Sequence, residues 1–178
     1  MKIFVSHSLK DIALISEIKR NTEPHGLQLL IAEHEKDTNH TITEKIENMI
    51  KHCDFALILL TQNGIYSKFV DQEIGYIQSL KKPYLQVVQE GFEKDIVGFN
   101  FGRDYIPFNP ASPNEAIMAI TTILINHWNA LQIEEQKQMA LKRQIEVRQQ
   151  EEQRNNEMKI IFGILAGVLV LGIVSNSN

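Results

Sequence analysis

Cysteine and clustered basic residues are scarce in this chain of 178 residues. Cys53 is the single cysteine, so no disulfide framework and no thiol-rich metal site can form, and a reducing compartment fits best. Next to an apolar run, Cys53 itself is interpreted as a small core residue. The formal net charge is −4. Because nucleic acids are bound by clustered Lys and Arg, we expect no nucleic acid as partner.

The first residues of the chain also show no signal-peptide pattern. The first residues lead directly into a predicted strand, without the charged-then-apolar layout of a secretion signal. Residues 1–128 carry 16 acidic and 12 basic side chains, whereas residues 129–178 carry six of each sign. This shift in composition predicts one globular domain over 1–128, long enough for a single buried core, followed by a different kind of segment.

Short apolar runs alternate with helical patterns along residues 1–128. The pattern predicts strands at 3–5, 27–32, 55–60, 84–88 and 105–108, and helices over about 12–22, 42–50 and 70–77 and from 113 onward. Such alternation favours an α/β fold. We expect a flavodoxin-like open parallel sheet of about five strands in the order 2-1-3-4-5, with helices on both faces and a long C-terminal helix.

This strand order predicts a binding crevice between the carboxyl ends of the first and third strands, where ligands bind in open parallel sheets. Ser6, His7 and Ser8 follow the first strand, and Asn63 follows the third. Glu73 lies on the helix after the third strand. Three separate segments therefore converge on one cleft, with a single carboxylate in it.

Plainer interpretations of these residues stay open. One alternative interpretation is that Glu73 is a solvated residue on the surface of a helix. Ser6, His7 and Ser8 suggest a nucleophile, but no acid is evident for a triad, so turn and helix-capping roles are favoured.

A second group of chemically reactive side chains lies between residues 33 and 40. Glu33, His34, Asp37 and His40 carry metal-ligating groups, but their spacing fits no closed site. A charged surface loop is the favoured interpretation, and we expect no metal.

Four spaced segments together resemble the TIR (Toll/interleukin-1 receptor) domain family over about residues 1–127. Residues 4–11, Phe-Val-Ser-His-Ser-Leu-Lys-Asp, resemble its opening motif, and residues 54–61 its third strand. Residues 66–74 resemble its glutamate box and residues 82–88 its fourth strand. The usual Trp of the glutamate box is Phe69 here, and the loop at 34–40 is charged and lacks the Pro and Gly of many members.

The resemblance implies an activity as well as a fold. Many TIR domains cleave NAD⁺ between nicotinamide and ribose, using the glutamate that aligns with Glu73. NAD⁺ is then the substrate and no cofactor is expected. Around a catalytic Glu73, the expected substrate-binding residues are Phe4, Ser6, His7, Ser8, Asn63, Ser67 and Phe69. The free backbone N–H groups after Ser8 offer a phosphate site, and Phe4 or Phe69 an apolar wall.

The last 50 residues have two parts. Residues 129–158 are rich in Glu, Gln, Lys and Arg and predict a charged helical stalk, in which a stable coiled coil is doubtful. Residues 160–174 form an unbroken apolar run, which predicts a single-pass membrane anchor over 159–175. Basic residues before the run place the folded domain in the cytoplasm. The alternative is a helix buried in an oligomer core.

Taken together, the sequence predicts a membrane-tethered TIR domain of bacterial type that hydrolyses or cyclises NAD⁺. We expect homo-oligomers through TIR–TIR contacts and a role in stress or anti-phage defence, all implied by the resemblance. A non-catalytic TIR scaffold and a nucleotide-signal receptor remain as alternatives.

Overall fold

The computed structural model describes residues 1–32, 42–96 and 102–175, and from residue 165 on only the backbone. By internal contacts the chain divides into two units, Met1–Trp128 and Asn129–Asn178. The first unit contains the sheet and the helices that pack on it, and it is described first.

Five parallel strands form one sheet in the order β2-β1-β3-β4-β5, as the alternation predicts. The strands are β1 (Lys2–Ser6), β2 (Gln28–Ile31), β3 (Phe55–Leu60), β4 (Tyr84–Gln89) and β5 (Tyr105–Phe108). The central strand β3 is buried along its whole length, which explains why its sequence is a continuous apolar run. Both faces of the sheet are therefore covered.

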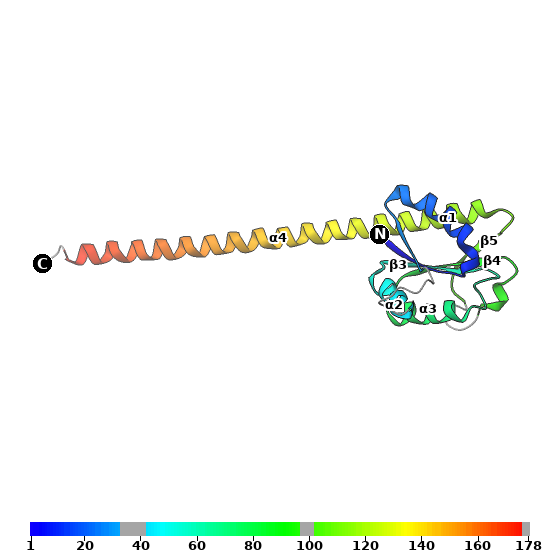
Figure 1. Cartoon of the computed structure of the whole chain (residues 1–178). Coiled ribbons are helices and arrows are strands. Elements are labelled where there is room, and N and C mark those ends of the chain that lie inside the picture. The colour runs from blue at the N-terminus through cyan, green and yellow to red at the C-terminus, as the bar shows by residue number, and fades with distance from the viewer. Residues whose placement is uncertain (33–41, 97–101, 176–178) are drawn as a thin grey trace. The chain divides into compact units, whose positions relative to one another are not determined.

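Helices cover the two faces in pairs (Figure 1). Helix α1 (Ile12–Thr22) and the first part of α4 (Pro113–Ser175) pack on one face, whereas α2 (Ile42–His52) and α3 (Lys68–Ser79) pack on the other. Three short 3₁₀ helices, η1 (Leu9–Asp11), η2 (Glu23–His25) and η3 (Glu93–Asp95), complete the described elements. Each face buries its own apolar cluster, so the sheet is enclosed between two helical layers.

Alternation along β1 decides which residues face which layer. Ile3 and Val5 belong to the cluster under α1 and α4, whereas Phe4 belongs to the cluster under α2 and α3. Successive side chains of a strand point to opposite faces, so Ser6 lies on the same face as Phe4. That face is the one on which the helix carrying Glu73 packs.

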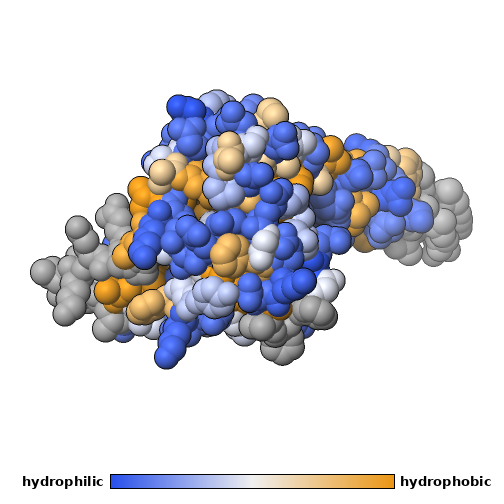
Figure 2. Space-filling view, turned by 90° about the vertical axis from the view of Figure 1, so that its right-hand side faces the viewer, coloured by the Kyte–Doolittle hydropathy of each residue, from blue (hydrophilic) through white to orange (hydrophobic). Residues whose placement is uncertain are grey.

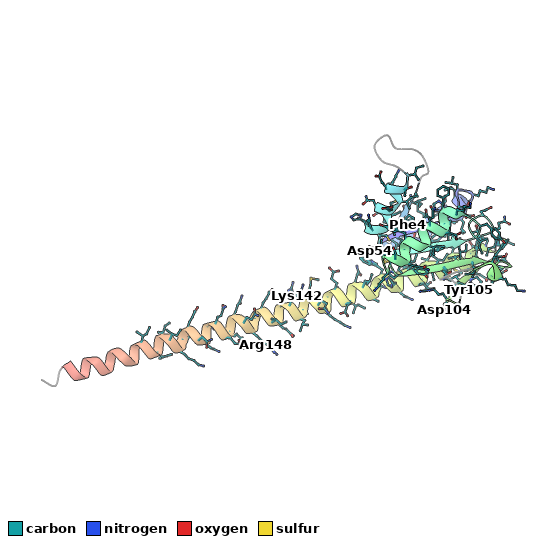
Figure 3. All side chains as sticks on the ribbon, turned by 90° about the horizontal axis from the view of Figure 1, so that it is seen from below. Phe4, Asp54, Asp104, Tyr105, Lys142 and Arg148 are labelled. Atoms are coloured by element: carbon teal, nitrogen blue, oxygen red, sulfur yellow. The ribbon has the colours of Figure 1, made fainter. Side chains whose placement is uncertain are left out.

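The second unit is the remainder of α4, which is exposed at every residue from 129 to 164. Charged side chains such as Lys142 and Arg148 project from it (Figure 3). Large apolar side chains such as Leu141 and Ile145 are exposed on it as well, and the charged stalk over residues 129–158 stays a prediction.

The expected membrane anchor at residues 159–175 is wrong. Among the residues that the structure describes, no helix is long and apolar enough to cross a membrane. The apolar run has only 15 residues, from Ile160 to Val174. At about 1.5 Å per residue it spans roughly 22 Å, against roughly 30 Å of hydrocarbon. Two further expectations depended on this anchor, a membrane partner and a folded domain held at the cytoplasmic side of a membrane, and both are therefore wrong.

Candidate functional site

The candidate site lies on the α2–α3 face, at the carboxyl end of β1. The segment after β1 begins with His7, and Ser8 caps η1 by accepting a hydrogen bond from the Lys10 N–H at 3.4 Å. Ser67 caps α3 in the same way, accepting from the Val70 N–H at 3.5 Å. These caps fix where both helices begin, and the second one places Glu73 in the second turn of α3.

Glu73 is buried and bonded to the end of β1. Glu73 is only 7% exposed, and Ser6 is fully buried at 0%. The Ser6 hydroxyl donates a hydrogen bond to Oε2 of Glu73 at 2.5 Å. Burial raises the pKa of Glu73 from 4.5 to about 7, and the Ser6 hydrogen bond acts in the opposite direction. The carboxyl group therefore changes its charge close to neutral pH.

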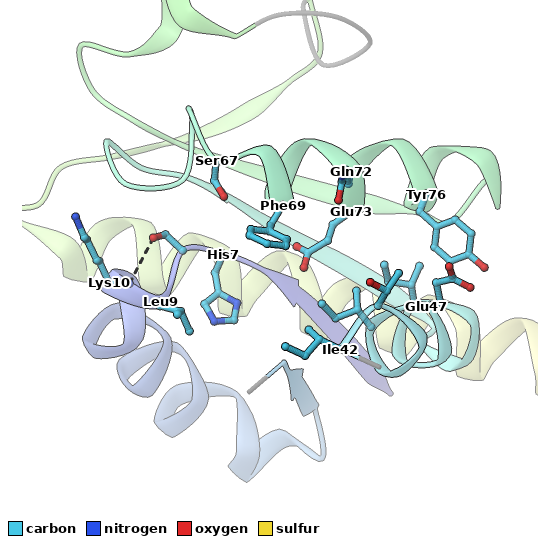
Figure 4. A pocket seen from close by; sticks show the side chains of 14 residues that line it. His7, Leu9, Lys10, Ile42, Glu47, Ser67, Phe69, Gln72, Glu73 and Tyr76 are labelled. Carbon is cyan, nitrogen blue, oxygen red and sulfur yellow. Dashed lines mark hydrogen bonds between the residues drawn. The ribbon is translucent and has the colours of Figure 1, made fainter. Parts of the chain in front are cut away.

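A cavity of about 760 Å³ opens beside Glu73. Of the described residues, those that line it come from three segments: residues 7–10 after β1, residues of α2 between 42 and 50, and residues of α3 between 69 and 76, together with the cap Ser67. Figure 4 shows the Glu73 carboxylate pointing into this cavity, with Phe69 and His7 on one side and Tyr76 and Glu47 on the other. The volume lies in the range of small-molecule and cofactor sites.

His7 is held firmly at the cavity wall. Its residue is 5% exposed, and Nδ1 lies 2.8 Å from the Val5 carbonyl oxygen. Since a carbonyl oxygen can only accept, Nδ1 carries the proton and donates this bond. The ring orientation is therefore fixed by its own strand.

Phe69 is 62% exposed although it lines the cavity, so its ring lies at the mouth of the cavity rather than at its floor. Figure 2 views the domain from the side to which the carboxyl ends of the strands point, where hydrophilic residues predominate and hydrophobic ones gather in smaller patches. An exposed phenyl ring at the mouth of a cavity offers an apolar contact to a planar ligand.

Two of the predicted site residues lie away from the cavity. Phe4 is fully buried in the cluster under α2 and α3 and does not line the cavity; Figure 3 labels it in the folded domain. Asn63 donates through Nδ2 to Oδ1 of Asp11 at 3.0 Å, outside the lining. The structure thus gathers His7, Ser8, Ser67, Phe69 and Glu73 around the cavity and adds Ser6 through its hydrogen bond.

A buried polar network that the sequence did not suggest lies next to the site. Asp11 is 6% exposed and accepts hydrogen bonds from Thr61 Oγ1 at 2.9 Å and from Asn63 at 3.0 Å. Thr61 Oγ1 in turn accepts from the Gly64 N–H at 3.2 Å. The network ties η1 to the end of β3, so its role is to hold the two sides of the crevice together.

Nine residues that line the cavity were not predicted as site residues: Leu9, Lys10, Ile42, Thr43, Ile46, Glu47, Ile50, Gln72 and Tyr76. A signal for two of them is present in the sequence. Residues 69, 72, 73 and 76 share one face of a helix at spacings of three and four, so a catalytic Glu73 implies that Gln72 and Tyr76 line the same cavity. The α2 residues have no comparable signal.

No group of three His, Cys, Asp or Glu side chains suited to a metal ion occurs among the described residues. The metal-ligating candidates of the sequence, Glu33, His34, Asp37 and His40, lie outside the residues that the structure describes.

One family model and several solved structures are similar to this chain. A sequence model of the TIR domain family matches residues 3–120. The structure is similar to the TIR domain of the Toll-related receptor TRR-2 from Hydra magnipapillata, at 10% identity over 70% of this chain and 97% of that one, with a TM-score of 0.56. It is also similar to the CMP N-glycosidase BcmB of Clostridium botulinum, at 15% identity over 67% and 98%, with a TM-score of 0.48.

The TIR domains of the activated Roq1 resistosome, which recognises the effector XopQ, match at 13% identity over 52% of this chain and 60% of that one, with a TM-score of 0.45. At such identities the structural likeness concerns the fold alone. A sequence search among curated proteins gave no match.

Proposed function

The chain belongs to the TIR domain family, whose members include NAD⁺-cleaving enzymes, and we propose that it cleaves NAD⁺ with Glu73 as the catalytic carboxylate. The products are nicotinamide and a linear or cyclic ADP-ribose. The observation that carries the proposal is the carboxyl group of Glu73, buried at the wall of a 760 Å³ cavity, with a pKa near neutral pH. Titration near the working pH, together with burial in a cavity, is typical of catalytic groups.

The proposed reaction breaks the bond between the ribose C1′ and the nicotinamide nitrogen. The electron pair of that bond stays with the nitrogen, so the cationic ring leaves as neutral nicotinamide and needs no general acid. Positive charge develops on the ribose, and the ionised Glu73 stabilises it. Water then supplies a hydroxyl to C1′ and releases a proton, or an adenine nitrogen bonds to C1′ and closes a ring.

The remaining cavity residues take supporting roles in this proposal. Phe69 provides the apolar wall for a planar ring at the cavity mouth, since its exposed phenyl group lines the opening. His7, Ser8 and Ser67 supply polar contacts to ribose or phosphate from the cavity wall. Phe4 and Asn63 lie outside the cavity lining, so we assign them no substrate contact.

We extend the proposal to assembly and setting on family resemblance alone. Copies of the chain associate through TIR–TIR contacts, and the activity serves a bacterial type of stress or anti-phage response. Association raises the local concentration of the domains, so neighbouring copies complete each other's pockets.

Incubation of the full chain with NAD⁺ tests the proposal, followed by NMR at dilute protein and again at high protein with a crowding agent. Nicotinamide release that is lost in Glu73→Gln supports the enzyme. Binding of NAD⁺ without release overturns it in favour of a nucleotide receptor using the same cavity. If NAD⁺ is neither bound nor cleaved under either condition, the enzyme proposal is overturned and a non-catalytic TIR scaffold is the remaining interpretation.

A further inference from the structure

Among the residues that the structure describes, the Ser6 hydroxyl makes one hydrogen bond, which is its bond to Glu73. We infer that Ser6 is the positioning residue of the site, holding the Glu73 carboxylate at the cavity wall and favouring its charged form. The inference rests on the proposed role of Glu73. It replaces the expectation that Ser6 contacts the substrate directly.

The geometry of the contact carries the inference. The Oγ–Oε2 distance of 2.5 Å falls at the short end of hydrogen bonds from a hydroxyl to a charged oxygen. Ser6 is 0% exposed and Glu73 is 7% exposed, so water competes little for either group. A substrate in the cavity reaches Glu73 without meeting Ser6, because Ser6 is absent from the cavity lining.

The donor is also rigid. Ser6 is the last residue of β1 and pairs with Ile58 in the register of the β1–β3 ladder. Ladder hydrogen bonds therefore fix its backbone, and the acceptor sits on a helix whose start is fixed by the Ser67 cap. Two elements that are far apart in sequence thus meet at one buried bond, and the bond fixes the carboxylate at a defined place in the cavity.

Two opposing influences act on the charge of Glu73. Burial raises its pKa, and the Ser6 hydrogen bond lowers it. A hydroxyl that donates to a carboxylate stabilises the ionised form and has little to give to the protonated one. Without the hydroxyl, Glu73 is expected to titrate about one pH unit higher.

Other titratable or charged groups also line the cavity and face the same region. They are His7 after β1, Lys10 on η1, Glu47 on α2 and Tyr76 on α3. All of them remain in a variant that changes only Ser6, so the titration of Glu73 itself has to be observed.

The test is a carbon-detected NMR titration of the Glu73 side-chain carboxyl in the full chain, in wild type and in variants at position 6. In Ser6→Ala the midpoint is expected to rise by about one pH unit, and Ser6→Thr, which keeps the hydroxyl, is expected to restore it. Ser79→Ala is the matched control. Ser79 lies exposed on α3, the helix that carries Glu73, and its hydroxyl donates to the Tyr76 carbonyl oxygen at 2.8 Å. An unchanged midpoint in Ser6→Ala overturns the inference.

If Ser6→Ala does not fold, Ser6→Cys keeps the side-chain shape with a weaker donor and is expected to show a smaller rise of the midpoint. An unchanged midpoint in that variant overturns the inference equally. The acid limb of nicotinamide release is expected to move by the same amount as the NMR midpoint.

The NMR result is independent of turnover, so it separates the two hypotheses. A wild-type chain that releases no nicotinamide while its Glu73 midpoint moves in Ser6→Ala refutes the proposed enzyme but supports the contact. If nicotinamide is released but the Glu73 midpoint does not move in Ser6→Ala, only the role of Ser6 is refuted and the proposed enzyme stands.

Discussion

Replacement of Glu73 by glutamine should make the fold more stable at alkaline pH and leave it nearly unchanged in acid. The unperturbed pKa of this carboxyl, which applies to the unfolded chain, is 4.5. Burial raises the pKa to about 7 in the folded chain. Between those values the folded chain keeps a proton that the unfolded chain has lost. The free energy of unfolding contributed by Glu73 is therefore fully present below about pH 4.5 and is lost as the pH rises through 7.

The magnitude follows from the distance between the two pKa values. They differ by about 2.5 pH units, and at about 1.4 kcal/mol for each unit the wild-type chain loses about 3 kcal/mol between pH 4 and pH 8. The glutamine side chain of the variant carries no charge at any pH and keeps an oxygen that accepts from the Ser6 hydroxyl. We expect Glu73→Gln to be more stable than wild type by about 2–3 kcal/mol at pH 8 and within about 1 kcal/mol at pH 4.

Denaturant unfolding of the full chain at a series of pH values measures this difference. Trp128 is the single tryptophan and packs against the core cluster under α1 and α4, so its fluorescence reports on residues 1–128. Asp71→Asn is the matched control, because Asp71 is an exposed acid on the same helix. A stability difference between wild type and Glu73→Gln that does not change from pH 4 to pH 8 would refute the reasoning.

Four further outcomes are expected. Nicotinamide release by the wild type should rise about tenfold per pH unit below pH 7 and level off above it, since the ionised Glu73 is the active form; a rate that falls as the pH rises would contradict this. Phe69→Ala should raise KM for NAD⁺ about tenfold with little change in unfolding free energy, because the ring is 62% exposed, and an unchanged KM would remove Phe69 from the binding wall. Gly64→Ala should destabilise the chain by about 1–3 kcal/mol, because a Cβ there would lie 2.5 Å from the Leu59 carbonyl oxygen. Gly75→Ala meets nothing within 4 Å on α3 and should stabilise the chain by up to about 1 kcal/mol, so equal unfolding energies for the two variants would contradict the packing argument.

Much of the fold could be predicted because its signals are local. The unbroken apolar run at 55–60 marks a strand that is covered on both faces, and the structure confirms β3 there. The order of the five strands then follows from right-handed crossovers, and the observed sheet has that order. The strand and helix ends differ by one or two residues, since β1 begins at Lys2 and α3 at Lys68.

The site could be predicted only in part, because contacts between distant side chains leave no local pattern. The bond between Ser6 and Glu73 joins residues 67 positions apart, and no periodicity shows it. Phe4 illustrates the opposite limit: it shares a face with Ser6, but two residues earlier in the strand it belongs to the apolar core and does not line the cavity. The placement of Phe4 depends on depth in the sheet, which strand alternation does not give.

The C-terminal expectation failed for a reason of length. The run from Ile160 to Val174 has the composition of a membrane span, but its roughly 22 Å had to be extended by flanking polar residues to reach across a bilayer. Among the described residues no helix meets the requirement. Composition alone was therefore a poor guide to this segment.

The most direct test of the account is the rate of nicotinamide release from NAD⁺ at pH 8 by the full chain, by Glu73→Gln and by Asp71→Asn. The two carboxylates are two residues apart on α3, one buried in the cavity wall and one exposed. The account predicts equal rates for wild type and Asp71→Asn and a loss of at least about 100-fold in Glu73→Gln. Equal rates in all three chains, or no release by a folded wild type even under crowding, would contradict it.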